Sequence, residues 1–382
     1  MKKKLLILVN SLSFFLSHRL EVALAAKNKG YEVQIGYGEI GNANTKILSK
    51  KGIKFFCFPL ERISINPIKE MWSLFIIWRI FRKLKPDIVH LVTIKPYLYG
   101  GIAARLAGVP SVVSAIAGLG ILFNEKNWSN YFLQKILFPL FYFAFRHTNQ
   151  KIIVQNLEDK KILLNLTNID KKKILLFHGS GVNLALFSSL EEIKGTTNIC
   201  FASRLLENKG VHCYVSAARL IKKRGLKARF FLAGNLDEGN LTSLSQNELD
   251  YIIKEKVVEV LGYQKNIPSL FARSHIVCLP SFYGEGLPKV LVEAAAASRA
   301  VVTTEIPGCR DAIIPNVTGL LVPPKNPEKL ADVIQYLIEH PIKRKAMGEA
   351  GRQLAERKFK IEKIVQNHLD VYDDLIKNTF YI

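Results

Sequence analysis

The chain has 382 residues, of which 49% are hydrophobic and 23% are charged, close to the average of globular proteins. This composition excludes a disordered or fibrous protein, and the length favours two domains. The cysteines are few, scattered and without C-x-x-C spacing, which excludes a disulfide scaffold or a cysteine-rich zinc module and indicates a reducing cytoplasm. They are Cys57, Cys200, Cys213, Cys278 and Cys309. No apolar run approaches the ~18 residues of a membrane-spanning helix.

The net charge of +22 is concentrated in the first half of the chain. Up to Ser180 there are 27 basic and 10 acidic residues, a balance of +17, whereas the remainder has 27 and 22, a balance of +5. This asymmetry predicts an anionic partner for the first half, either nucleic acid or an anionic membrane surface. The alternative is the solvated surface of an ordinary basic protein.

The N-terminus resembles the start of a signal peptide, because Lys2–Lys4 precede the apolar run Leu5–Val9. The run is short, however, and ends at Asn10. Charged or polar residues then stand where the apolar segment would continue: His18, Arg19 and Glu21. We therefore expect Leu5–Val9 to be a buried first strand, and the protein to be uncleaved and cytoplasmic.

Short apolar runs alternate with helical stretches in the first half of the chain, the pattern of βαβ units and a parallel sheet. The predicted strands are Leu5–Val9, Tyr31–Tyr37, Ile53–Leu60, Ile88–Val92, Ser111–Ala115, Lys151–Gln155 and Ile174–Phe177. The predicted helices are Leu16–Lys29, Pro67–Leu84, Tyr97–Ala107 and Trp128–Phe145.

A second series follows the polar stretch Ser188–Thr197. Its predicted strands are Asn198–Ala202, Ala228–Ala233, Val257–Leu261, Ile276–Leu279, Ala300–Thr303 and Gly319–Val322, with helices at Gly210–Lys223, Pro288–Ala297 and Pro327–Glu339. The tail Arg344–Lys377 has a helical period. We expect an α/β protein with two doubly wound domains, 1–187 and 188–360, and a C-terminal helix, 361–382, that packs back on the first domain. Ligands of such sheets bind beyond the carboxyl ends of the strands.

Several common catalytic motifs are missing from the sequence. Gly36–Gly41 formally matches G-x-G-x-x-G, but it closes the second strand and no convincing helix follows it. The sequence has no G-x-x-x-x-G-K-[ST], G-x-S-x-G or H-E-x-x-H. It also lacks D-x-D, so a carboxylate-held metal on a nucleotide diphosphate is not indicated. We expect no cofactor and no metal in the reaction.

The strongest signal is Ser281–Glu293, a glycine-bracketed loop that follows a strand and leads into a helix with Pro288 near its start. The N–H groups of a helix start suit an anion or a polar sugar. Glu285 lies in the loop and Glu293 on the helix, so both can accept hydrogen bonds from hydroxyl groups in one pocket. Glu293 would otherwise be an ordinary surface carboxylate, but its apolar neighbours indicate that the helix is largely buried.

A second signal, Ser203–Gly210, follows the first strand of the second domain. Arg204 and Lys209 flank the position where an open α/β sheet binds a diphosphate. Two cations and a helix N-terminus can neutralise a leaving diphosphate without a metal. Either residue alone would be an ordinary solvated cation at a helix start.

The spacing of Arg204 and Lys209, with the E-x7-E from Glu285 to Glu293, resembles the retaining glycosyltransferases of the two-domain GT-B class, similar to glycosyltransferase family four. The likeness in the second domain covers Asn198 to Pro324. The first domain resembles a bacterial subgroup that builds surface polysaccharides and lipid-linked oligosaccharides. The matching stretches are Phe15–Arg19, Thr93–Gly100, Gly118–Gly120 and His178–Val182.

The resemblance implies a nucleotide-sugar donor, whose diphosphate Arg204 and Lys209 would hold and whose ribose Glu293 would bind. Glu285 and the backbone of Gly286, Leu287 and Pro288 would grip the donor sugar. Many relatives have a histidine where this sequence has Ile116–Gly118, so a catalytic histidine is missing there. The resemblance then suggests attack of the acceptor hydroxyl on the front face of the sugar, assisted by the leaving diphosphate, with retention of configuration.

Basic residues after strands of the first domain are the candidates for binding a phosphate of the acceptor. They are His18, Arg19 and Lys95. His18 has the alternative of packing locally. The resemblance implies a lipid-diphosphate-linked saccharide as acceptor and, as donor sugar, an N-acetylhexosamine such as N-acetylgalactosamine from UDP.

Two stretches suit an in-plane helix on an anionic leaflet, because they combine basic residues with tryptophan, phenylalanine or tyrosine. They are Met71–Lys85 and Tyr131–Arg146. The alternative is a helix that covers the sheet. We expect peripheral association with the inner face of the cell membrane.

Two other functions compete with the transferase. A nucleotide-sugar epimerase shares the architecture, and a nucleic-acid-binding protein would explain the charge. The sequence has no RRM-like signature, helix-turn-helix pattern or zinc module, so nucleic acid is not an expected partner.

Overall fold

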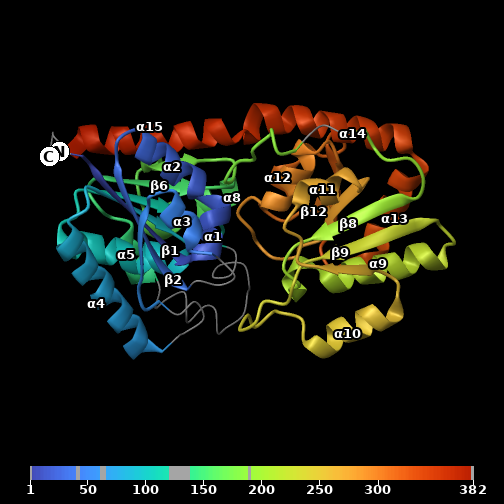
Figure 1. Cartoon of the computed structure of the whole chain (residues 1–382), viewed down its shortest axis with the longest axis horizontal. Coiled ribbons are helices and arrows are strands. Elements are labelled where there is room, and N and C mark those ends of the chain that lie inside the picture. The colour runs from blue at the N-terminus through green and yellow to red at the C-terminus, as the bar shows by residue number, and fades with distance from the viewer. Residues whose placement is uncertain (1, 40–43, 61–65, 120–137, 188–190, 380–382) are drawn as a thin grey trace. The chain divides into compact units, whose positions relative to one another are not determined.

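The computed structural model describes residues 2–39, 44–60, 66–119, 138–187 and 191–379. The chain forms two compact units, one of Met1–Ser180 with Glu362–Ile382 and one of Gly181–Ile361. The boundaries expected from the sequence were 187 and 360. Each unit contains one parallel sheet with helices packed against it (Figure 1).

The sheet of the first unit has seven strands in the order β3-β2-β1-β4-β5-β6-β7. They are β1 (Lys4–Ser11), β2 (Glu32–Glu39), β3 (Lys54–Cys57), β4 (Ile88–Val92), β5 (Ser111–Ala115), β6 (Gln150–Val154) and β7 (Ile174–Leu176). Strand β1 lies inside the sheet, where Leu5 pairs with Val33 on one side and with Ile88 on the other. The apolar run Leu5–Val9 is therefore a buried strand, as expected.

Both faces of this sheet are covered, which explains the nearly continuous apolar runs of its strands. Successive side chains of a strand point to opposite faces. Leu5 and Ile7 therefore pack with the helices Leu20–Asn28 (α2) and Ile361–Thr379 (α15), whereas Leu6 and Leu8 pack with Pro67–Leu84 (α4) and Ile94–Ala107 (α5). The helices of this unit are α1 (Leu12–His18), α2 (Leu20–Asn28), α3 (Lys46–Lys50), α4 (Pro67–Leu84), α5 (Ile94–Ala107), α8 (Leu157–Thr167) and α15 (Ile361–Thr379), with a 3-10 turn at Lys171–Lys173.

The sheet of the second unit has six strands in the order β10-β9-β8-β11-β12-β13. They are β8 (Thr197–Ala202), β9 (Ala228–Ala233), β10 (Glu259–Gly262), β11 (Ile276–Leu279), β12 (Ala300–Thr304) and β13 (Gly319–Val322). The helices are α9 (Val211–Lys223), α10 (Gln246–Glu255), α11 (Ile267–Ala272), α12 (Lys289–Ala296), α13 (Pro327–Glu339) and α14 (Pro341–Leu354), with 3-10 turns η2 (Glu207–Lys209) and η3 (Arg310–Ala312) and a π turn at Ala355–Phe359. The direction of strand succession reverses between β8 and β11, which is the usual place of a ligand site in such sheets.

The structure confirms the predicted fold class, and every predicted strand is present with small shifts at its ends. The helix predicted at Leu16–Lys29 is instead two helices, because Arg19 has φ −133° and ψ −6° and interrupts the hydrogen-bond ladder. The predicted tail helix is likewise interrupted at Lys360, whose ψ of 127° is extended. The helices α3, α8, α10 and α11 were not predicted. Residues 128–137 of the helix expected at Trp128–Phe145, and 40–41 of the glycine motif, lie outside the described residues.

A buried polar cluster joins α15 to the first sheet. His90 of β4 is hydrogen-bonded through Nδ1 to the Tyr372 hydroxyl of α15 at 2.6 Å, and the His368 ring lies 5.6 Å from the His90 ring, centroid to centroid. Arg19 is only 1% exposed and interacts electrostatically with His90, His368 and Tyr372. Burial, followed by the Arg19 charge, lowers the pKa of His368 to about 3, and burial lowers that of His90 well below its usual value.

This cluster predicts that acid destabilises the first unit. Below about pH 6.5 the unfolded histidines take up protons that the folded ones reject, so the unfolding free energy falls by about 1.4 kcal/mol per pH unit for each such histidine. The loss begins as the pH drops below 6.5 and continues toward 3. Urea unfolding at several pH values gives the unfolding free energy as a function of pH. Between pH 6.5 and 3 this free energy should fall less steeply for His368→Gln than for the wild type. The same pH dependence of the unfolding free energy in both proteins would contradict the prediction. His340→Gln, at an exposed histidine, is the control and should keep the pH dependence of the wild type.

Candidate active site

The candidate site lies on the second unit, at the carboxyl edge of its sheet. The loop 203–210 follows β8, the segment from Gly234 follows β9, the loop 280–288 follows β11 and the turn from Glu305 follows β12. Because parallel strands all end at the same edge, these four segments are neighbours although they are far apart in the sequence.

Three glycines with positive φ allow these segments to touch through their backbones. A Cβ on Gly234 (φ 145°) would lie 1.8 Å from the Ser203 carbonyl oxygen, and one on Gly210 (φ 81°) would lie 2.1 Å from that of Pro280. A Cβ on Gly308 (φ 82°) would lie 1.8 Å from the Gly286 carbonyl oxygen. No side chain fits at these distances, so the glycines hold four strand ends together in the order β9, β8, β11, β12.

The loops after β8 and β11 are also joined by polar contacts. The backbone carbonyl of Asn208 accepts hydrogen bonds from Ser281 Oγ (2.9 Å) and from the Phe282 amide (3.1 Å). Beside them, Lys209 Nζ donates to Glu285 Oε2 at 2.5 Å, and both side chains are largely buried, with 16% and 12% exposed. The structure therefore brings together the predicted residues Lys209 and Glu285.

Arg204 belongs to the same loop but is half exposed, and its guanidinium pairs with Asp237 in the segment after β9. Asp237 also accepts from Asn240 Nδ2 at 3.0 Å. The two cations of the loop are thus each paired with a carboxylate. A lysine ammonium has three donors, so Lys209 can keep Glu285 and still donate to a phosphate oxygen.

The helix that follows the 280–288 loop carries Glu293 in a largely buried position. Lys289 Nζ lies 3.4 Å from Glu293 Oε1. Burial raises the pKa of Glu293, and the charge of Lys289 opposes that shift. Pro288 is the N-cap of α12 and not its first helical residue, with φ −61°, and the Gly286, Leu287 and Pro288 stretch is buried. A buried carboxylate near a helix start is chemically suited to accept hydrogen bonds from ribose hydroxyls.

The three acceptor candidates lie in the first unit and differ in what they offer. His18 is partly exposed, stacks on Phe14 with a centroid distance of 4.2 Å and is hydrogen-bonded to Ser17 Oγ. Lys95 Nζ donates to Glu70 Oε1 at 2.6 Å, so its charge is compensated by a carboxylate of α4. Arg19 is buried and donates to the His18 carbonyl at 2.9 Å. In this structure the Arg19 side chain is therefore buried and interacts with His90, His368 and Tyr372, so it offers less to a ligand than His18 or Lys95 does. Its role in binding the acceptor stays a prediction.

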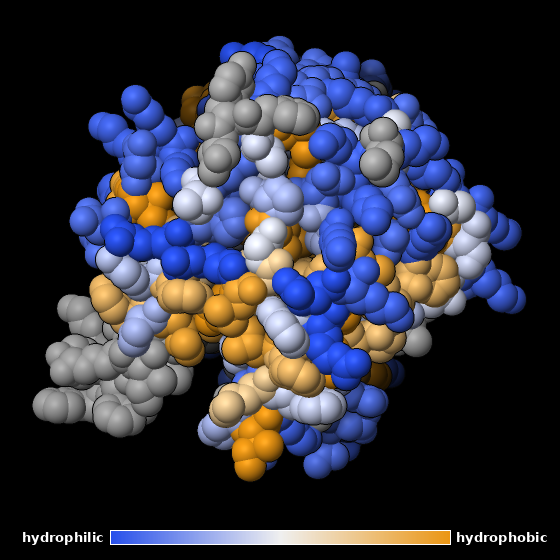
Figure 2. All heavy atoms as spheres, turned by 90° about the vertical axis from the view of Figure 1, so that its left-hand side faces the viewer, coloured by the Kyte–Doolittle hydropathy of each residue, from blue (hydrophilic) through white to orange (hydrophobic). Residues whose placement is uncertain are grey.

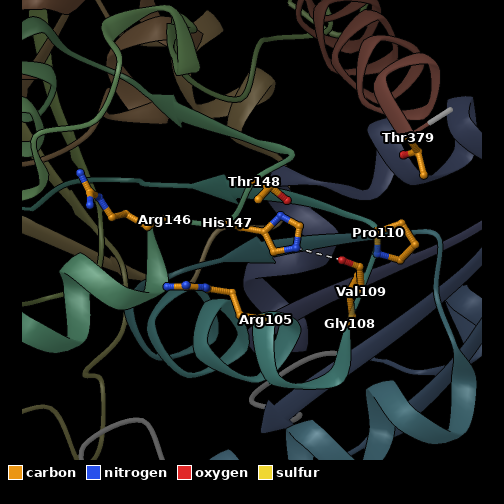
Figure 3. A pocket seen from close by; sticks show the side chains of 8 residues that line it. All are labelled: Arg105, Gly108, Val109, Pro110, Arg146, His147, Thr148 and Thr379. Atoms are coloured by element: carbon orange, nitrogen blue, oxygen red, sulfur yellow. Dashed lines mark hydrogen bonds between the residues drawn. The ribbon is translucent and has the colours of Figure 1, made fainter. Parts of the chain in front are cut away.

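A pocket of about 450 Å³ lies at the opposite edge of the first sheet, where β5 and β6 begin (Figure 3). Its lining residues are Arg105, Gly108, Val109, Pro110, Arg146, His147, Thr148 and Thr379. His147 lies centrally among them, and its Nε2 donates to the Val109 carbonyl at 2.9 Å. The pocket lies at the amino ends of strands, whereas the candidate donor site lies at the carboxyl ends of strands in the other sheet.

Sequence reasoning missed three residues of the site: Asp237, Gly234 and Gly308. All three follow strands whose loops carry no cationic motif, so nothing in the local pattern singled them out. Only their position directly after predicted strands could have indicated them, because all strands of a parallel sheet end at the edge where ligands bind.

Comparison with known proteins identifies the family. Residues 185–354 match the family described as glycosyl transferases group 1, and residues 4–156 match the one described as glycosyl transferase 4-like. The chain is therefore a glycosyltransferase of the GT-B class, similar to family four. The first match contains every candidate donor residue, and the second contains His18, Arg19 and Lys95.

Two curated relatives match most of the chain. An N,N'-diacetylbacillosaminyl-diphospho-undecaprenol alpha-1,3-N-acetylgalactosaminyltransferase of Campylobacter jejuni is 27% identical over 95% of this chain and 99% of its own. A UDP-Gal:alpha-D-GlcNAc-diphosphoundecaprenol alpha-1,3-galactosyltransferase of Escherichia coli is 27% identical over 85% of each chain.

Among solved structures, the Anabaena protein HepE, determined in complex with UDP, is 18% identical, with a TM-score of 0.77 over 98% of this chain and 100% of its own. A glycosyltransferase of Rickettsia africae is 22% identical, with a TM-score of 0.76 over 99% of each chain. At these identities the likeness shows the fold. The family matches favour the transferase over the epimerase and the nucleic-acid-binding protein.

The close contact at Gly308 gives a test of the site. Gly308→Ala should force the 285–286 backbone away and weaken binding of the nucleotide-sugar donor at least tenfold, measured by calorimetry. Gly225→Ala is the matched control, because Gly225 also has positive φ (73°) but has no atom within 4 Å of an added Cβ. The control should lose only about 1–2 kcal/mol of stability from its left-handed backbone and keep its affinity for the nucleotide-sugar donor. Equal affinity of the two variants for the nucleotide-sugar donor would show that the 285–286 loop does not hold the donor.

Proposed function

We propose that the protein transfers a sugar from a UDP-sugar to a lipid-diphosphate-linked saccharide with retention of configuration, in the assembly of a bacterial surface glycan. The sugar we propose is an N-acetylhexosamine such as N-acetylgalactosamine. The observation that carries the proposal is the Lys209–Glu285 pair beside Arg204 at the carboxyl edge of the second sheet. The names of the Campylobacter and Escherichia relatives, which act on diphospho-undecaprenol-linked saccharides, support the acceptor class. The UDP in the HepE structure supports the nucleotide.

In this proposal Arg204 and Lys209 bind the donor diphosphate, and no metal is needed. Arg204 is half exposed, so its guanidinium can turn from Asp237 to a phosphate oxygen at little cost in burial. Lys209 stays next to Glu285 and donates to the phosphate with another of its protons. The charge that develops on the leaving diphosphate is then stabilised by Lys209, which Glu285 holds in place, and by Arg204 once it has turned to the phosphate.

Glu293 would bind the ribose, and Glu285 would bind a hydroxyl of the donor sugar. With no evident carboxylate nucleophile, the acceptor hydroxyl attacks the anomeric carbon from the face on which the diphosphate leaves. The bond from that carbon to the diphosphate oxygen breaks, the bond to the acceptor oxygen forms, and the acceptor proton passes to the leaving diphosphate. On the acceptor side, His18 and Lys95 remain candidates for a phosphate contact, and Arg19 would act by fixing the backbone of His18.

The first unit is proposed to contact the inner face of the cell membrane. On α4, the inward face is formed by Ser73, Ile77 and Phe81, so Phe81 belongs to the core. The outward face has apolar residues in its first half and basic residues in its second. The apolar ones are Ile68 (79% exposed), Met71 (71%), Trp72 (55%) and Phe75 (43%), and the basic ones are Arg79, Arg82, Lys83 and Lys85.

The segment 138–146 has the same character. The rings of Tyr142 and Phe143 are exposed. The Arg146 guanidinium lies over the Tyr142 ring, 4.3 Å from its centre, and the Arg105 guanidinium lies over the Phe143 ring, 3.9 Å from its centre. Figure 2 views the side of the molecule on which α4 lies and shows apolar and strongly hydrophilic side chains next to one another. Aromatic rings beside cations suit the interface of an anionic leaflet. None of the described helices is long and apolar enough to cross a membrane.

The proposed reaction is tested by incubating the purified protein with UDP- and GDP-sugars and lipid-diphosphate-linked saccharides, with products identified by mass spectrometry. A parallel reaction without acceptor distinguishes transfer from epimerisation, and anomeric NMR of the product distinguishes retention from inversion. We expect turnover to persist in EDTA. Complete loss in EDTA that magnesium or manganese restores would refute the metal-free diphosphate site.

The two carboxylates should differ in their kinetic effects. Glu293→Ala should raise KM for the donor about 10- to 100-fold with a small change in kcat, because the ribose contact is the same in the ground and transition states. Glu285→Ala should also lower kcat, since this residue contacts the reacting sugar. Glu339→Ala, at an exposed glutamate of α13, is the control. Small and equal effects of the two substitutions would mean that the donor binds elsewhere.

Membrane association should depend on the outward face of α4. Replacing Arg79, Arg82, Lys83 and Lys85 by glutamine should weaken binding to anionic liposomes, at about 1 kcal/mol per charge, and leave turnover on a short water-soluble acceptor nearly unchanged. The matched control makes the same charge change in the second unit at Lys222, Lys223, Lys254 and Lys256. High salt should release the wild type only partly, because apolar burial is not screened. A wild type that ignores anionic liposomes would rule out this part of the proposal.

A further inference from the structure

Three side chains that can ligate a metal gather on the second unit, and none of them is a candidate donor-binding residue. They are Glu207 of η2, His212 of α9 and Glu248 of α10, and one ligand atom of each lies within 4.8 Å of the others. The three residues come from three different elements, and Glu248 is 36 positions or more away from the other two along the chain. The cluster is therefore a product of tertiary structure and not of a local charge run.

The spacing of two of these atoms already fits a zinc ion. His212 Nε2 and Glu248 Oε1 are 3.3 Å apart. Two ligands about 2.0–2.1 Å from a tetrahedral zinc are separated by roughly 3.3–3.4 Å. The exposed Glu207 offers the third ligand atom, a carboxylate oxygen within 4.8 Å of the other two atoms.

Neighbouring groups hold two of the ligands in place. Glu248 Oε2 accepts from the Ser245 amide and hydroxyl, both at 2.7 Å, in the capping box of α10, which leaves Oε1 directed toward His212. Glu207 is also linked to the segment that precedes α10, because its backbone amide donates to the Thr242 carbonyl at 2.7 Å. Such outer contacts orient ligands in known metal sites.

We propose that this cluster binds one Zn²⁺ ion through Glu207, His212 and Glu248. The two carboxylates neutralise the ion, and the imidazole favours zinc over magnesium or calcium. A pocket of about 300 Å³, lined by His212, Glu248 and Tyr251 among others, leaves room for a water as fourth ligand. Arg219 also lines this pocket, but its guanidinium is paired with Glu255, which compensates its charge.

A metal ion bound by Glu207 would also affect the loop 203–210, which carries Arg204 and Lys209. Glu207 lies between Arg204 and Lys209, so a bound ion fixes the loop 203–210 to α10. The ion is a structural clamp on that loop and takes no part in the transfer. Turnover without metal and zinc binding at this cluster are therefore separate properties, and the failure of one leaves the other standing.

The experiment uses the full-length, tag-free protein with Cys57→Ser, which removes an exposed thiol that would also bind zinc. After chelation and dialysis, titration with Zn²⁺ in a calorimeter should show one ion per chain and a rise in Tm. Co²⁺ should give the visible absorption of a low-coordinate site. His212→Ala and Glu248→Gln should weaken Zn²⁺ binding at least tenfold. Glutamine still serves the capping box, so Glu248→Gln keeps the start of α10.

His340→Ala is the control, because His340 is another exposed histidine of the same unit and lies outside the cluster. Its Zn²⁺ affinity and stoichiometry should equal those of the parent protein. Metal-free Tm values of all variants establish that each is folded. Absence of saturable Zn²⁺ binding by the parent, or unchanged binding by folded His212→Ala, overturns the proposal.

Discussion

The candidate site of the second unit depends on the close approach of the segments that follow four strands, β8, β9, β11 and β12. The ion pair between Lys209 and Glu285 joins two of these segments. Glycine backbones bring the loops after β8 and β11 together, with Gly210 against Pro280. Only then can a lysine of one loop meet a glutamate of the other at 2.5 Å. A donor diphosphate placed there would meet a lysine that Glu285 already orients, so little reorganisation of Lys209 is required as charge develops on the diphosphate.

The first unit uses burial for a different purpose. Its buried histidines, Tyr372 and the Arg19 guanidinium join α15 to the sheet, so a cation at the end of α1 serves packing and not solvent contact. The basic residues that face outward are on α4 and around 138–146, next to exposed aromatic rings. The excess charge of this half is thus found on a surface where apolar and electrostatic attraction to a membrane would add together.

Much of this was predictable from the sequence. The strands follow from short β-branched runs, and α12 follows from Pro288 and the apolar residues after it. The likeness carried by Arg204, Lys209, Glu285 and Glu293 indicated the family before any coordinates. The boundaries of helices were less predictable. Nothing in the local pattern shows that Arg19 interrupts a helix, because that break serves contacts with residues more than 340 positions away.

The sequence by itself determined the parallel sheets, the position of the ligand edge and the residue types that bind an anion there, because periodicity and loop chemistry are local properties. Tertiary structure decided which charges are compensated. Asp237 meets Arg204, Glu70 meets Lys95, and Glu248 meets His212, each across a separation that no motif spans. The reason is physical: whether a cation is available to a ligand depends on the carboxylate that the fold places beside it, and that distance is set by the packing of whole elements.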